Sequence, residues 1–209
     1  MFQRALVAGV FALGLAQAET LDRIAVSVGQ DVITESQVIM DLRVAAFLEK
    51  KPLDLSGAAK RGDAERLVDQ LLILREAADS HVTLPSTEAA AGLVAPYAAE
   101  SSYQADLARY GISEGDLAAH LLAGLRTLTF TDLRFRPDVQ VSPDDIRSYY
   151  DNIVRQPGAA AAAPIPSFEE SREQIEKLLT EQRTLEALDK WLETTRSAAR
   201  VQYREKAFQ

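Results

Sequence analysis

The 209-residue sequence contains no cysteine and only two histidines. Without cysteine the fold can have neither disulfides nor thiolate metal sites, although an oxidising compartment is tolerated. His81 and His120 lie within helical patterns and lack acidic or thiol companions, so they form a poor ligand set for a metal. We expect structural or surface histidines, no cofactor, and stability that comes from packing alone.

Basic residues are also in short supply. The chain has 23 Lys and Arg against 31 Asp and Glu, a formal net charge of −8, and no Lys/Arg run interrupts this balance locally. Nucleic-acid affinity comes largely from neutralising phosphates, which an acidic chain cannot do. We therefore expect no nucleic-acid partner.

Long hydrophobic runs are absent beyond residue 20, where charge interrupts every apolar stretch within a few positions. The first residues combine Arg4, an apolar run over residues 5–16 and the small-x-small triplet Ala16-Gln17-Ala18. That run is shorter than the roughly 20 residues of a transmembrane helix. We expect a signal peptide over residues 1–18, cleavage after Ala18, and a periplasmic protein without stable membrane insertion or a lipid-bearing cysteine.

The mature chain opens with a strand pattern. Residues 23–28 alternate so that Ile24, Val26 and Val28 share one face, and Gly29-Gln30-Asp31 supplies a turn into a short return strand. Thr34, with Gln37 three residues later, has the pattern of a capping box and predicts a helix of about fourteen residues. The sequence thus predicts a hairpin leading directly into a helix.

Apolar residues then recur at helical spacing over most of the chain. A loop is expected at 51–62, with the alternative that its latter half belongs to the next helix, which Asp63 can cap. Ser86, Ser113 and Ser142 stand where N-caps are favoured. The predicted helices cover about 63–80, 86–99, 103–110, 113–134 and a segment that opens at Pro143.

A segment rich in proline and alanine, residues 156–167 (QPGAAAAAPIPS), divides the chain and predicts an irregular linker. Beyond it, apolar residues follow helical spacing over some thirty positions and must dock on the upstream body to avoid solvent. Val201 and Tyr203 could extend the sheet of the hairpin. We expect a helical domain over 19–155, the linker, and a C-terminal helix and tail over 168–209 that complete that domain.

The order of these elements and several motifs resemble the SurA family of periplasmic chaperones and peptidyl-prolyl isomerases. The resemblance rests on LDRIAVSVGQDVITESQV at the mature start, LVDQLLILREA, VTLPSTE, YGIS and VSPDDIRSYY, and covers residues 21–154. The C-terminal WLETTRSAARVQY is similar to the SurA tail, which in that family packs back on the N-terminal domain. The expected fold is mainly α, a SurA-N-type helical module with a short N-terminal β-hairpin and a long C-terminal helix packed against it.

The chain departs from the family where parvulin-type isomerase domains would stand, because only residues 156–167 occupy that place. The resemblance implies an ATP-independent chaperone module that lacks its catalytic insert and binds unfolded outer-membrane or secreted polypeptides. We therefore expect that the protein is not an enzyme. The periplasm contains no ATP, so a chaperone there must bind and release its clients by mass action. An ATP-independent module is consistent with that compartment.

Other patterns that suggest chemistry have simpler explanations. The string Gly111 to Gly115 matches G-x-S-x-G, but a nucleophile elbow requires a preceding strand, and Ser113 follows a helical stretch as a cap. The acidic pairs Asp144-Asp145 and Glu169-Glu170 fall in first helical turns, where carboxylates complement the helix dipole. We expect no catalytic residue and no metal ligand.

Client binding requires exposed apolar surface between helices. The candidate peptide-binding residues are six aromatic side chains near predicted helix ends: Tyr97, Tyr103, Tyr110, Phe135, Tyr149 and Tyr150. Ordinary core or rim packing is the competing explanation for each of them. Two other functions stay open at this point, an isomerase-family protein with residual or no activity, and a non-catalytic adaptor or homodimer formed by exchange of the tail.

Overall fold

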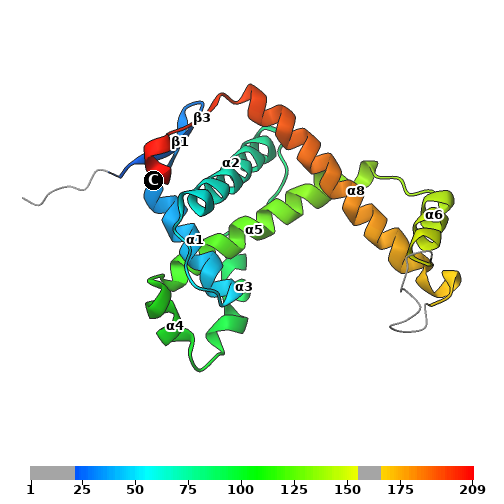
Figure 1. Ribbon diagram of the computed structural model, residues 1–209, viewed down its shortest axis with the longest axis horizontal. Helices are drawn as coiled ribbons and strands as arrows, with labels where there is room; N and C mark the ends of the chain where they lie inside the picture. Colours follow the sequence, from blue (N-terminus) through cyan, green and yellow to red (C-terminus); the bar gives the residue numbers. More distant parts are fainter. Residues whose placement is uncertain (1–21, 155–165) are drawn as a thin grey trace, which may run out of the picture.

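The computed structural model describes residues 22–154 and 166–209, and these residues form a mainly helical protein with a small sheet (Figure 1). The expected signal peptide and residues 156–165 of the expected linker lie outside the described residues. The elements in chain order are β1 (Ile24–Val28), β2 (Asp31–Thr34), α1 (Glu35–Glu49), α2 (Gly57–Asp79), α3 (Ala89–Ala98), α4 (Tyr103–Tyr110), α5 (Glu114–Arg134), the 3-10 turn η1 (Arg136–Asp138), α6 (Pro143–Val154), α8 (Phe168–Ala198), β3 (Val201–Tyr203) and the 3-10 turn η2 (Glu205–Phe208).

The sheet has the order β2-β1-β3, and both pairings are antiparallel. Gly29 makes the hairpin turn with φ +61, and β3 extends the hairpin as the sequence predicted. One detail of the predicted strand is wrong. The β1–β2 register shifts between Ile24 and Val26, so Ile24 is 41% exposed while Ala25 is fully buried beside Val26.

The predicted caps of α1 and α5 are confirmed. Thr34 accepts from the backbone N–H of Gln37, and the Gln37 side chain accepts in return from the Thr34 N–H at 2.8 Å. Ser113 forms the same reciprocal arrangement with Asp116. Ser113 is therefore a cap in this structure, with no strand before it.

Two predicted helix caps are wrong. Helix α2 begins at Gly57, in the latter half of the predicted loop, because the Ser56 side chain accepts from the N–H of Ala59 at 3.2 Å and provides the cap seven residues before Asp63. Asp63 lies inside α2 and is buried. Helix α3 begins at Ala89, and Ser86 makes no capping bond to it.

The C-terminal helix α8 docks on the body, as predicted. Its second half packs on α2 and α5 and contributes Leu188, Leu192 and Trp191 to the main core, which also contains the strands and Phe130. Its first half extends away from the body and carries α6, so that α6 and this half of α8 form an arm on one side of the molecule (Figure 1). The fold thus places a separate apolar cluster, around Ile146 and Ile175, in the arm.

Candidate functional site

Three of the six predicted aromatic residues meet in one place. Tyr97 from α3, Tyr103 from the start of α4 and Tyr110 from its end surround Phe47 of α1, with ring centroids 6.2, 6.4 and 6.0 Å from the Phe47 ring. A cavity of about 280 Å³ opens beside this cluster, and its mouth carries Lys50 together with other charged residues. This tyrosine pocket has an aromatic floor and a charged rim.

The tyrosine pocket is held together by its own hydroxyl groups. Tyr103 is 5% exposed and donates to Glu114 at 3.3 Å, while Tyr110 donates to the main-chain oxygen of Lys51 at 3.0 Å. Burial and the neighbouring Glu114 carboxylate raise the pKa of Tyr103, so this hydroxyl stays protonated. Both rings therefore serve chiefly as packing, and the pocket offers a visiting chain little apolar surface.

Phe135 is not part of a binding surface. It is 7% exposed and packs edge-on against Phe130 and close to Trp191, with centroid distances of 5.9 and 6.0 Å. The prediction placed it at a helix end, where it does lie, but α8 covers that end. Phe135 is corrected to a core residue.

Tyr149 and Tyr150 lie in the arm and line a groove between α6 and the first half of α8, which we call the arm groove. Its volume is about 260 Å³, and its remaining lining is mostly apolar. Tyr150 donates to the main-chain oxygen of Pro166 at 2.8 Å and stacks edge-on against Phe168. The lining residues are Tyr149, Tyr150, Ile153, Pro166, Ser171, Gln174, Ile175 and Leu178.

Two leucines of α8 extend this apolar surface, and the sequence-based choice of residues missed them. Leu178 is 43% exposed in the arm groove, and Leu185, seven residues and two helical turns further on, is 46% exposed. Their seven-residue spacing puts them on one face of the helix. Both leucines belong to the apolar stripe of the C-terminal helix, but the sequence predicts that the whole stripe packs against the body.

An ion pair fixes the geometry of the arm. Arg183 of α8 lies 2.9 Å from the carboxylate of Asp145, which also caps α6 through the N–H of Ser142 at 2.9 Å. Arg183 and the Ser142 contacts hold the pKa of Asp145 well below its usual value, so the carboxylate is ionised at all physiological pH values. Asp145 lies in the first turn of α6, as predicted, and its carboxylate in addition completes a cap.

A second polar cluster joins α1, α2 and α5 behind the tyrosine pocket. His120 Nδ1 lies 2.7 Å from Asp41, Asp41 also pairs with Arg66, and Arg66 reaches Asp63 at 2.9 Å. Burial and the Arg66 charge lower the pKa of His120 to about 4, while burial raises the pKa of Asp63 to about 7. The cluster connects three helices.

The lowered pKa of His120 makes stability depend on pH. Because the unfolded chain binds this proton near pH 6.5 and the folded chain near pH 4, His120 stabilises the fold above pH 6.5 and loses that contribution as the pH falls towards 4. We expect the stability difference between wild type and His120→Asn to fall by about 1 kcal/mol between pH 7.5 and 5.5. Urea unfolding at both pH values measures it.

The effect of Asp63 has the opposite sign, since its raised pKa removes stability as the pH rises from about 4 to 7. Both proteins retain Asp63, so its effect cancels in the difference. The control is His81→Asn, because His81 is exposed at φ +56, a conformation that asparagine tolerates. A difference that does not change with pH would contradict a buried neutral His120.

The described residues contain no group of three or more His, Asp or Glu side chains placed to hold a metal ion. No helix within residues 22–154 and 166–209 is both long enough and apolar enough to cross a membrane.

Comparison of the chain with protein-family models, with curated proteins and with solved structures finds no match. The resemblance to the SurA family thus rests on the sequence motifs alone. What the chain could bind follows from the geometry of its grooves.

Proposed function

We propose that this protein is an ATP-independent periplasmic chaperone that binds unfolded polypeptides, with outer-membrane protein precursors as its main clients. The observation that carries the proposal is the open apolar arm groove, together with a second exposed leucine, Leu185, two helical turns beyond Leu178 on the same face of α8. Large apolar side chains on an exposed face mark sites of association in soluble proteins. The SurA-like motifs and the signal-peptide pattern support the client class and the compartment.

The shape of the arm supports weak, reversible capture. The arm groove is open to solvent, and its lining comes from α6, from the first half of α8 and from Pro166 just before α8. A partly exposed leucine contributes about 1 kcal/mol when a client covers it, so several such contacts give weak binding that releases without an energy source. The arm groove therefore suits many clients better than one tightly held ligand.

The test is suppression of aggregation of an unfolded outer-membrane protein by the mature chain. Replacing Leu178 and Leu185 with serine removes two contacts, and we expect the concentration needed for half-suppression to rise about twentyfold. Leu74→Ser is the matched control, because Leu74 is a 38% exposed leucine on α2 of the body. Circular dichroism confirms that both variants fold.

If the double variant and the control suppress aggregation equally well, the arm groove is not the client-binding site. No suppression by the wild-type chain at several-fold excess over the client would contradict the chaperone function itself. A protease-coupled proline-peptide assay on the same preparation tests the isomerase alternative, for which we expect no activity above the uncatalysed rate.

A further inference from the structure

The last nine residues of the chain occupy a groove between β1 and the start of α2, which we call the tail groove. Strand β3 pairs with β1, with Val26 opposite Tyr203, and the N–H of Arg204 donates to the Ala25 oxygen at 2.8 Å. The 3-10 turn η2 then lies against the first turn of α2. The tail therefore binds as an added strand followed by a tight turn.

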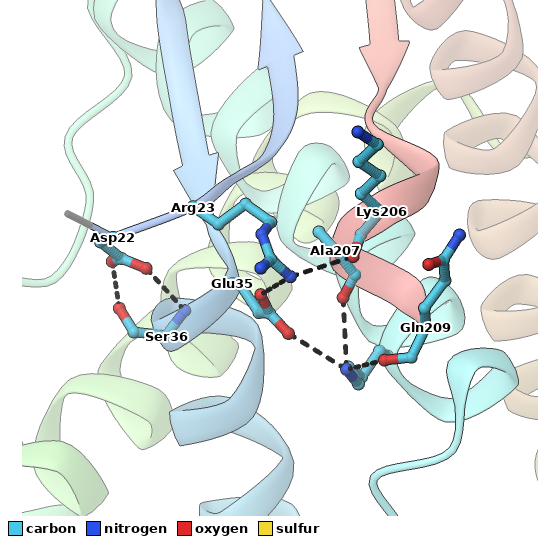
Figure 2. Close-up of polar contacts among 8 residues, drawn as sticks. Asp22, Arg23, Glu35, Ser36, Lys206, Ala207 and Gln209 are labelled. Atoms are coloured by element: carbon cyan, nitrogen blue, oxygen red, sulfur yellow. Dashed lines mark hydrogen bonds and ion pairs between the residues drawn. The ribbon is translucent and has the colours of Figure 1, made fainter. Parts of the chain in front are cut away.

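Basic side chains in the tail groove contact the main chain of the tail (Figure 2). Lys60 Nζ, on a residue only 6% exposed, donates to the oxygens of Ala207 at 3.3 Å and Gln209 at 3.0 Å. Arg23 donates to the oxygen of Lys206 at 3.0 Å. Glu35 pairs with both basic groups, at 3.1 Å from Lys60 and 3.0 Å from Arg23, and holds them in place. These bonds do not depend on which side chains the tail carries.

Four tail side chains pack against the protein at the tail groove: Val201 and Tyr203 are half-buried, and Ala207 and Phe208 are buried. The guanidinium of Arg61 lies 3.6 Å from the centre of the Tyr203 ring. The remaining tail side chains are exposed, and among them Glu205 makes a solvent-exposed ion pair with Arg61 at 3.1 Å. The tail groove thus selects an aromatic residue, a small residue four positions later and a second aromatic residue directly after it.

We propose that the tail groove is a peptide-binding site that accepts an extended segment of another polypeptide with this aromatic-x-x-x-small-aromatic pattern, and that residues 201–209 are its resident ligand. Main-chain recognition by Lys60, Arg23 and β1 supplies affinity, while the Arg61 face and the buried end supply selectivity. The site lies at the opposite end of α8 from the arm groove (Figure 1). It does not depend on chaperone activity.

The resident tail sets the concentration at which a second peptide can enter. A segment attached to the same chain has an effective concentration in the millimolar range, so a free peptide competes only at similar concentration. Weakening the tail removes this competition. The site should therefore be nearly closed in the wild-type chain and open when the tail loses its aromatic anchors.

The first experiment uses the wild-type chain and a synthetic peptide, VQYREKAFQ. Hydrogen exchange of the protein's own Arg204 amide reports release of the tail, because that amide is bonded to Ala25 in the docked state. At 2 mM peptide we expect its exchange rate to rise about tenfold or more. A control peptide with serine in place of tyrosine and phenylalanine should leave the rate unchanged. No change with either peptide would overturn the proposal.

The second experiment opens the site in the full chain with Tyr203→Ser and Phe208→Ser. A fluorescent peptide that keeps only the tyrosine, alanine and phenylalanine of the tail, with serine elsewhere, should bind this variant at least about tenfold more tightly than it binds wild type. Adding Arg61→Ala should weaken binding about fivefold, since the stacked cation is lost. Arg147→Ala is the control, because Arg147 makes the same kind of contact with Phe168 in the arm, 4.1 Å from the ring centre.

Equal peptide binding by the wild-type and opened chains, or equal effects of the two arginine substitutions, would overturn the proposal. Light scattering of the wild-type chain adds a separate outcome. If the wild-type chain is a dimer and the peptide dissociates it, the tail groove binds the tail of a second copy. That result would overturn the proposal that the groove binds a different polypeptide. If the opened chain fails to fold, the exchange experiment on wild type still decides the question.

Discussion

Replacing Phe130 with alanine is expected to lower the free energy of unfolding by about 3–5 kcal/mol. Phe130 is fully buried, and its ring contacts Phe135 at a centroid distance of 5.9 Å and Trp191 at 5.6 Å. Truncation would leave a cavity where α5 meets α8, and the rigid helices on both sides cannot close around it. Chemical denaturation monitored by Trp191 fluorescence measures the loss at the site itself.

Leu128 provides the control for this prediction. It lies two residues earlier on α5 and is 62% exposed, so Leu128→Ala should change stability by no more than about 0.5 kcal/mol. Equal losses for the two variants would mean that α8 does not dock where the structure places it. The same conclusion would follow if Phe130→Ala folds and unfolds at the same denaturant concentration as the wild-type protein.

Replacing Gly57 with alanine is expected to destabilise the protein by about 3 kcal/mol. An added Cβ would lie 2.1 Å from the main-chain oxygen of Phe208, and neither that oxygen nor the first turn of α2 can move without breaking the bonds that Lys60 makes to the tail. Glycine at this position is needed for close approach of two backbones. Thermal unfolding and exchange of the Arg204 amide report the effect.

The same substitution at Gly62 should have the opposite sign. Gly62 lies five residues further along α2 with nothing within 4 Å of an added Cβ, so alanine improves helix propensity and should stabilise by about 0.5–1 kcal/mol. Two glycine-to-alanine changes in one helix are thus predicted to act in opposite directions. If both substitutions destabilise the protein, the effect at Gly57 does not come from its contact with the tail.

Much of the local structure could be predicted from neighbouring residues. The capping boxes at Thr34 and Ser113 involve groups three positions apart, so the bonds they make are encoded within one helical turn. The hairpin turn at Gly29 needs a positive φ that glycine supplies. The start of α2 was predicted less well, because serine and aspartate both cap helices and the local pattern does not show that Ser56, rather than Asp63, makes the capping bond.

The candidate site was harder to predict, because aromatic residues near helix ends share no local signal that separates core from surface. Phe135 is the C-cap of α5 and Tyr149 lies in the middle of α6, yet α8 covers the first and leaves the second in an open groove. Leu178 and Leu185 follow the same helical stripe as the buried Leu179 and Leu188, and only the neighbours of each turn distinguish them. The SurA-like chaperone function stays a prediction from the motifs.

The sequence by itself determined the helical class, the caps at Thr34 and Ser113, the N-terminal hairpin and the need for the C-terminal helix to dock, because each depends on residues within a few positions of one another or on a continuous apolar stripe. The tertiary structure alone decided which part of α8 is covered and which lies in the arm. It also decided that Lys60, Arg23 and Gly57 meet residues 206–209, contacts between positions about 150 or more apart in the chain. Such contacts depend on how whole helices pack, and no local pattern encodes that packing.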